Sequence, residues 1–130
     1  MHPPFHFQQL SNIDAEIERL TAMRKQVIVN AAMAEEELES MRGMGKMMSD
    51  IVLKAAMMIM DLEMALVYVN AFLLPWRHYI SSEHFPNTLE TLPDEIPFAW
   101  TRADLSMFLA KVSKAVEHDR AVLLLEMSFE

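Results

Sequence analysis

The stretch Met41–Met48, MRGMGKMM, holds four methionines and the only two glycines of this 130-residue chain. Glycine readily ends a helix because it tolerates a left-handed backbone, and basic side chains such as Arg42 and Lys46 suit a helix C-terminus. The stretch therefore predicts a turn between two long helices, with its methionines pressed against the turn. The fold expected from this turn is all-α and is built on an antiparallel helical hairpin.

The segment before the turn carries a heptad pattern of apolar residues. Ser11 and Asp14 match a capping box, and residues 1–10 before them are expected to form a flexible arm. Apolar residues then recur at alternating spacings of three and four, interrupted only by Arg24: Leu10, Ile13, Ile17, Leu20, Val27, Ala31, Ala34, Leu38 and Met41. This spacing predicts a first helix over residues 11–42 with a coiled-coil stripe. Because such a stripe has to be covered, we expect a homodimer.

The segment after the turn predicts a second helix over residues 49–81 with two opposed apolar faces. One face is aliphatic and would pack on the first helix. The other face needs a third helix, a second subunit or a protein partner, and it includes Met57, Met60, Met64 and Val67. Methionine is common on surfaces that adapt to a partner, and simple core filling is the alternative for these residues. Pro75 removes a backbone donor, so this helix should end or kink there.

The C-terminal third of the chain predicts a connector and one more helix. Residues 82–100 contain three prolines and four acids with no Lys or Arg. This connector also carries large apolar side chains, so we expect it to wrap around the bundle. Thr101 and Asp104 match a second capping box, which predicts a third helix over residues 101–127. The whole chain, residues 1–130, is therefore expected to form a single all-α domain.

Three aromatic residues near the end of the second helix form a candidate contact patch with the methionines. Trp76, Tyr79 and Trp100 are of the types preferred as anchors at protein interfaces. No arrangement in the sequence indicates catalysis: the chain has no cysteine and no Gly-rich loop, and its five histidines do not form a metal set, since Pro3 and Pro4 lie between His2 and His6, which have i,i+4 spacing. We therefore expect a non-enzymatic protein without a metal or cofactor.

The charge and the hydropathy pattern exclude two other classes. A net charge of −8 disfavours direct binding to nucleic acid, since phosphates repel such a chain unless its bases cluster. Residues 55–74 are mostly apolar, but Asp61 and Glu63 lie near the middle of that window and oppose a membrane span. The first ten residues lack the basic and apolar regions of a signal peptide, so a cytoplasmic location is expected.

In size, acidity and helical content, the chain resembles the small helical anti-activators that bind quorum-sensing receptors of the LuxR type. The resemblance implies a regulatory protein that inhibits a transcriptional regulator by occupying its oligomerisation surface. Secretion or assembly chaperones share the same small, acidic, helical format, and they keep the apolar segments of an export client soluble. Both hypotheses predict a protein partner, and they differ in what that partner is.

Overall fold

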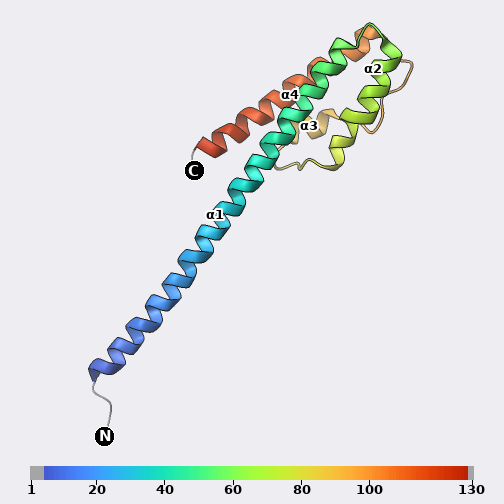
Figure 1. The fold of residues 1–130 in the computed structure, drawn as a ribbon. Helices are drawn as coiled ribbons and strands as arrows, with labels where there is room; N and C mark the ends of the chain where they lie inside the picture. The colour runs from blue at the N-terminus through green and yellow to red at the C-terminus, as the bar shows by residue number, and fades with distance from the viewer. Residues whose placement is uncertain (1–4, 129–130) are drawn as a thin grey trace. The chain divides into compact units, whose positions relative to one another are not determined.

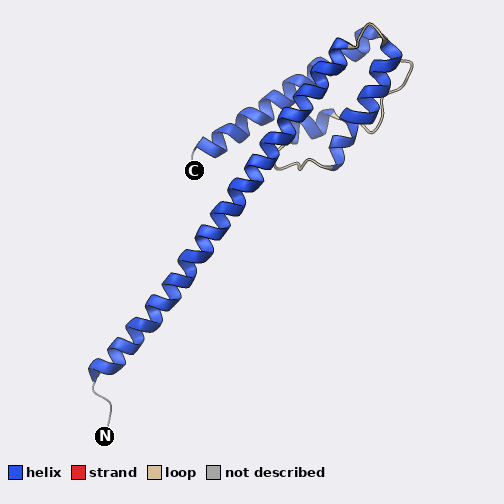
Figure 2. Ribbon diagram, viewed as in Figure 1, coloured by secondary structure: helices blue, strands red, loops and turns tan. Residues whose placement is uncertain are grey.

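A computed structural model of the chain describes residues 5–128, and every regular element in that range is helical (Figures 1 and 2). The all-α prediction is therefore confirmed. In chain order the elements are α1 (Phe5–Met57), α2 (Leu62–Tyr68), the π-helix η1 (Val69–Leu73), the 3-10 helix η2 (Leu74–His78), α3 (Pro86–Thr91) and α4 (Arg102–Ser128). The chain divides into two units, Met1–Glu37 and Leu38–Glu130, a finer division than the single domain predicted from length.

The predicted turn at residues 43–48 is not formed, because α1 continues through it. The predicted end of the first helix at residue 42 and the predicted start of the second at residue 49 are therefore wrong. Neither glycine adopts a positive φ, so neither uses the freedom on which that prediction depended. Gly45 serves close packing instead, since a Cβ at this position would lie 2.7 Å from Cγ of Arg120.

Met41, Met44 and Met48 of this stretch still contact the core, as their predicted packing requires, whereas Met47 is exposed. Met48 is fully buried, and Met41 and Met44 are half-buried against the same cluster. These positions recur on one face of a helix at spacings of three and four. The burial expected at a turn is therefore achieved on one side of a continuous helix.

The start of α1 also differs from its prediction. Ser11, expected to cap the first helix, lies inside α1, which is already helical at Phe5. The flexible arm predicted for residues 1–10 is wrong for residues 5–10, and residues 1–4 lie outside the described part of the chain. A capping-box pattern indicates a possible helix start, but the helix-forming residues on both sides of Ser11 allow the helix to continue.

The predicted second helix is broken at residues 58–61. Asp61 is the N-cap of α2, and its side chain accepts a hydrogen bond from the backbone N–H of Met64 at 3.3 Å. Arg102 donates from Nη2 to the carbonyl oxygen of Met60 at 3.0 Å, which satisfies an acceptor beyond the end of α1. After α2, the backbone changes to a π-helix and then to a 3-10 helix whose first turn holds Pro75. The change to the 3-10 form thus falls where the sequence predicts an end or kink.

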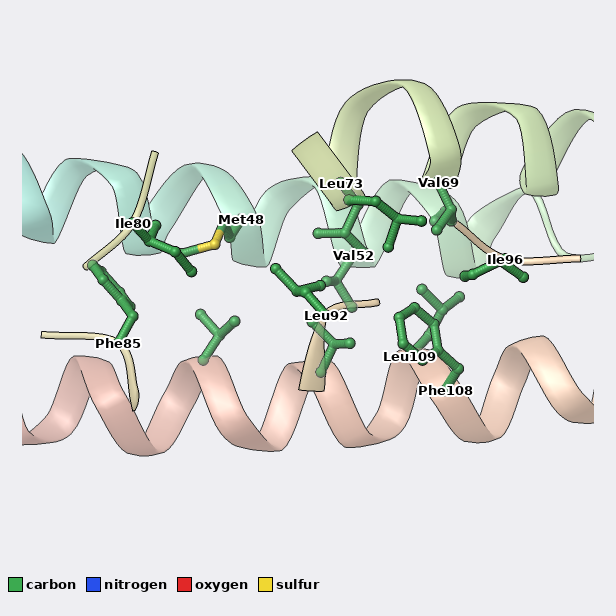
Figure 3. Close-up of a cluster of buried hydrophobic side chains, with 14 of the residues drawn as sticks. Met48, Val52, Val69, Leu73, Ile80, Phe85, Leu92, Ile96, Phe108 and Leu109 are labelled. Atoms are coloured by element: carbon green, nitrogen blue, oxygen red, sulfur yellow. The ribbon is translucent and has the colours of Figure 1, made fainter. Parts of the chain in front are cut away.

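A buried core in unit Leu38–Glu130 draws residues from α1, α2, η1, η2, the connector and α4, and Leu89 of α3 packs against it (Figure 3). The helix α1 contributes one side of the cluster, and α4 contributes the opposite side. The connector lies between them and is packed as predicted, since it supplies three fully or nearly fully buried side chains: Phe85, Leu92 and Ile96. The connector also includes the short helix α3, over Pro86–Thr91.

Two polar side chains fix the connector to the helices. Asn70 of η1 accepts a hydrogen bond from the N–H of Ile96 at 2.9 Å, and it donates to the carbonyl of Ile96 at 3.3 Å and to that of Leu66 at 2.9 Å. Such a side chain replaces the backbone partner that an irregular segment lacks. Two hydrogen bonds of one amide therefore join the π-helical turn to the end of the connector, and the third joins it to α2.

The second polar anchor is Asp119 of α4, which is only 1% exposed. Its carboxylate accepts hydrogen bonds from the N–H and Oγ1 of Thr88, at 2.8 and 2.7 Å, and from Nδ2 of Asn87 at 2.8 Å. Buried carboxylates are costly unless they are hydrogen-bonded in this way. Asp119 therefore attaches the first turn of α3 to the middle of α4.

The helix α4 begins at Arg102, within one residue of the predicted start. Its capping box is formed as predicted: the N–H of Asp104 donates to Oγ1 of Thr101 at 3.2 Å, and the N–H of Thr101 donates to Oδ2 of Asp104 at 2.9 Å. Arg102 reaches Met60, and Arg120 donates to Oγ of Ser49 at 3.1 Å. The helix α4 therefore runs antiparallel to the last turns of α1.

Candidate protein-interaction surface

Four apolar side chains that the sequence singled out are exposed in unit Leu38–Glu130, and we call them the methionine face. Their exposed fractions are 77% for Met57, 77% for Met60, 56% for Met64 and 51% for Val67. Core filling is thereby excluded for these residues within the described chain, because a core side chain would be almost fully covered. Exposed apolar groups that gather in one region indicate a surface for another macromolecule.

The local structure of the methionine face differs from the single helical stripe that was predicted. Met57 is the last residue of α1, and Met60 lies in the turn that follows. Met64 and Val67 lie three residues apart on α2, and together with Asp61 and Glu63 they line a shallow hollow of about 330 Å³. An apolar floor with two carboxylates at its edge suits a partner surface that is apolar and has a basic margin.

The three predicted aromatic anchors do not all lie together. Trp76 and Tyr79 make an edge-on ring contact, with centroids 6.2 Å apart, and Tyr79 is exposed. Trp100 packs edge-on against Phe108 of α4 at 5.6 Å, next to Arg102, which bonds Met60. Trp76 comes fourteen helical residues after Leu62, the first residue of α2. It therefore lies about 20 Å from the N-terminal end of α2. Trp76 and Trp100 are both half-buried against the core, and Tyr79 is the largely exposed member of the three.

A groove between α1 and α4 is a feature that the sequence reasoning missed. It has a volume of about 460 Å³ and is lined by both helices: Ser49, Asp50, Val52, Leu53, Ala56, Ser106, Leu109, Ala110, Ser113 and Glu117. Its floor is apolar, and Asp50 and Glu117 lie toward one side. The available signal was the set of small residues Ser106, Ala110 and Ser113 at helical spacing on α4, which leave room between neighbouring helices.

Unit Met1–Glu37 presents a third apolar surface, on α1. Every residue from His6 to Met33 is exposed, including the large members of the heptad stripe. In the heptad notation abcdefg, with Leu10 as a, positions a and d of this unit are 50–65% exposed wherever they carry Leu, Ile or Val. The same heptad numbering continues into unit Leu38–Glu130, where Gly45, Met48, Val52 and Ala55 fill positions a and d and are buried.

The polar side of this segment carries one strong local ion pair. Arg19 donates from Nε to Oε2 of Glu16 at 3.0 Å and pairs with the other carboxylate oxygen through Nη2. The Arg19 guanidinium lowers the pKa of the Glu16 carboxyl below its ordinary value of 4.5. This is a pair at spacing i,i+3 on a solvated helix, which supports the helix slightly and has no catalytic geometry.

Within residues 5–128, no three or more His, Cys, Asp or Glu side chains are grouped so that they could hold a metal ion. In the same part of the chain, none of the helices combines the length and the apolar content that a membrane crossing requires.

A scan against protein-family models, a search of curated proteins and a search of solved structures found no significant match to this chain.

Proposed function

We propose that this chain is a non-enzymatic regulatory protein that binds a protein partner through its methionine face. The observation that carries the proposal is the exposure of Met57, Met60, Met64 and Val67, the last two of which line a hollow with Asp61 and Glu63. Unbranched thioether side chains adapt to different contours at low cost, so they suit a binding surface more than a solvent-facing one. The acidic margin favours partners whose contact region is apolar with basic edges.

The partner class that we propose is a transcriptional regulator whose own oligomerisation surface is helical and apolar. A small protein that covers such a surface would prevent the regulator from assembling on DNA, and it would need no nucleic-acid contact itself. The net charge of −8 fits that role, because the protein would repel DNA while attracting the basic surroundings of a DNA-binding domain. We place this function in the cytoplasm, and we propose that the protein acts as a homodimer.

The experiment is a tagged capture of the full chain from its native host, followed by mass spectrometry and by a DNA-binding assay on any captured regulator. The test variant is Met60→Glu with Met64→Glu, and the matched control is Met33→Glu with Met47→Glu. All four methionines are exposed, so both variants add the same charge at exposed positions. We expect the first variant to lose the regulator and the control to retain it.

Either of two results would contradict this proposal: capture that is equal for both variants, or a captured regulator that still binds DNA. A loss of the helical circular dichroism signal in the first variant alone would show that the methionine face is structural. The tryptophan emission of Trp76 and Trp100 gives a second check that unit Leu38–Glu130 is folded in both variants.

The groove between α1 and α4 favours a second candidate, an assembly or secretion chaperone. A groove of about 460 Å³ with an apolar floor can hold a short apolar segment of a client protein. In that case capture should yield an aggregation-prone export substrate, and Ala110→Trp, which fills the groove, should abolish binding while the methionine-face variant retains it. The two candidates thus depend on different residues and can be separated by the same capture experiment.

A further inference from the structure

The exposed heptad stripe of residues 7–37 has no covering element in the described chain. A helix of this length has little stability in water from its residues alone, and most helical stability in proteins comes from packing of an apolar face. Yet Leu10, Ile13, Ile17, Leu20 and Val27 are all at least half exposed. The sequence pattern therefore specifies an interface, and the question is what covers it.

Two general occupants are disfavoured by the charges around the stripe. The outer side of the segment carries acids at both ends, including Glu18 and Glu36, whereas membrane-surface helices carry Lys and Arg on the polar face. The same acids repel nucleic acid. A helical protein surface is left, and the side-chain sizes within the stripe indicate which one.

The stripe is graded in size along its length. Its first half has large residues at positions a and d, namely Leu10, Ile13, Ile17 and Leu20, and its second half has Val27, Ala31 and Ala34. A parallel pair would place Leu and Ile against their own copies at one end and Ala against Ala at the other. An antiparallel pair centred on residue 22 would instead place the large residues Leu10 and Ile13 opposite the alanines of the other copy, which is how well-packed interfaces fill space.

We propose that this segment pairs antiparallel with the same segment of a second copy, with residue 22 on the two-fold axis. The facing layers are then Leu10 with Ala34, Ile13 with Ala31, Ile17 with Val27 and Leu20 with Arg24, each occurring twice. The overlap covers residues 7–37, a length of about 45 Å. The inference rests on the proposed homodimer and names its segment, its direction and its register.

The residues at the g positions beside the stripe agree with this register. In this register, each residue at a g position faces a g-position residue of the other copy, and the two residue numbers sum to 46. Glu16 therefore faces Asn30, and Glu37 faces Gln9. Each carboxylate is thus opposite an amide that can donate to it, and no acid at a g position faces another acid.

Arg24, which interrupts the stripe, also favours the antiparallel pair over the parallel one. In a parallel pair, two Arg24 side chains would share one layer with apolar neighbours on both sides, and like charges in one layer are destabilising. In the antiparallel pair each Arg24 faces Leu20 of the other copy, and the two arginines are four residues apart along the axis, about 6 Å. Each long side chain can then extend to solvent over the edge of the interface.

Cysteine cross-linking tests the direction and the register, and the chain has no native cysteine to interfere. Full-length Ile13→Cys and Ala31→Cys proteins, with tags of different mass, are oxidised separately and as a mixture. The antiparallel register predicts a cross-linked heterodimer in the mixture and little product from either protein alone. A parallel pair would instead cross-link Ile13→Cys to itself, and that result would overturn the proposal. Cysteine at Ala15, on the outer side at position f, is the negative control.

Sedimentation equilibrium tests whether the segment causes dimerisation. The wild-type chain should have twice its mass of 15.0 kDa at micromolar concentration. Ile17→Glu with Leu20→Glu should give the monomer mass while leaving tryptophan emission from unit Leu38–Glu130 unchanged, and the matched control, Ala15→Glu with Ala22→Glu, should stay dimeric. A monomeric wild-type protein, or a dimer that survives Ile17→Glu with Leu20→Glu, would overturn the inference.

These outcomes are separable from those of the proposed function. Met60→Glu with Met64→Glu should leave the dimer mass and the Ile13–Ala31 cross-link unchanged, since both residues lie in the other unit. Loss of partner capture with an intact dimer supports the methionine face alone. Loss of the cross-link with intact capture refutes only the antiparallel pairing.

Discussion

Alanine substitution of the two glycines in the stretch Met41–Met48 tests which glycine is required for close packing. Both lie in the interior of α1 and neither has a positive φ, so an alanine can adopt either backbone conformation. Alanine is favoured over glycine in a helix interior by about 1 kcal/mol. At Gly43 an added Cβ would meet nothing within 4 Å. Gly43→Ala should therefore stabilise the protein by about 0.5–1 kcal/mol.

Gly45→Ala should behave in the opposite way because the space beside it is occupied. The new Cβ would lie 2.7 Å from Cγ and 3.1 Å from Cδ of Arg120, and 3.4 Å from Cε1 of the fully buried Phe85. Moving the Arg120 stem would disturb its hydrogen bond to Ser49. Overpacking of this kind costs about 1–3 kcal/mol, against a helix-propensity gain of about 1 kcal/mol. The net effect is a destabilisation of about 0–2 kcal/mol, and the two alanine variants should differ by about 1–3 kcal/mol.

The assay is thermal and urea unfolding followed by tryptophan fluorescence, because Trp76 and Trp100 both lie in the unit that contains the two glycines. For a chain of this length, 1 kcal/mol corresponds to a shift of about 3–5 °C in Tm. Gly43→Ala should raise Tm, and Gly45→Ala should leave it unchanged or lower it. Equal stabilisation by both substitutions would refute the reasoning, since it would mean that Arg120 moves aside at no cost.

Three further predictions concern the polar groups. Asp119→Ala should destabilise unit Leu38–Glu130 by about 2–4 kcal/mol in urea unfolding. The substitution leaves the buried N–H and hydroxyl of Thr88 without their acceptor. A loss of stability below about 1 kcal/mol would show that water replaces the carboxylate. Asn70→Leu should cost about 1–3 kcal/mol and speed hydrogen exchange at the Ile96 amide, whose acceptor it removes, and unchanged exchange would contradict the assigned bond. NMR titration should place the Glu16 pKa below 4.5, and Arg19→Gln should return it to that value. Because the folded-state pKa is lowered, the support that this pair gives to the helix is present above pH 4.5 and is lost as pH falls through the folded-state value.

The parts of the fold that depend on local chemistry could be predicted from the sequence. The start of α4 followed from Thr101 and Asp104, whose side chains and backbones satisfy each other within one turn. The change of helix type at Pro75 followed from a missing donor. The packed connector followed from large apolar residues among prolines. In each case the cause lies within a few residues of its effect.

The parts that failed depend on residues far apart in the chain. Glycine permits a helix to end but does not require it, and the reason for glycine at position 45 is the stem of Arg120, seventy-five residues later. The break at residues 58–61 was hidden because Met58, Ile59 and Met60 continue the apolar periodicity of a helix. Asp61 was a usable signal, since it is a favoured N-cap residue, but the bond from Arg102 to Met60 could not be foreseen.

The candidate site was predictable in composition but not in arrangement. Periodicity placed Met57, Met60, Met64 and Val67 on a face with nothing assigned to cover it, and all four are exposed. It could not assign Trp100 to its packing against Phe108, because that contact depends on where the connector joins α4. The groove between α1 and α4 was missed because small residues on one helix indicate a groove only when the neighbouring helix is known.

The heptad stripe of residues 7–37 and the methionine face use two different kinds of apolar side chain, and the difference supports two separate roles. The heptad stripe of residues 7–37 has Leu, Ile, Val and Ala at positions a and d, and no methionine at those positions. Branched side chains have few rotamers, so they specify one register and one partner. The methionine face instead has three thioethers that can follow contours of different shapes. Branched side chains suit a partner that is always the same, such as a second copy. Thioether side chains suit a partner whose folded surface has its own contour.

Leu20→Met should therefore leave most of the protein dimeric while allowing other registers. These registers would appear as new cross-links in the cysteine assay. If Leu20→Met instead preserves a single cross-link, rotamer restriction in the stripe is not what fixes the pairing.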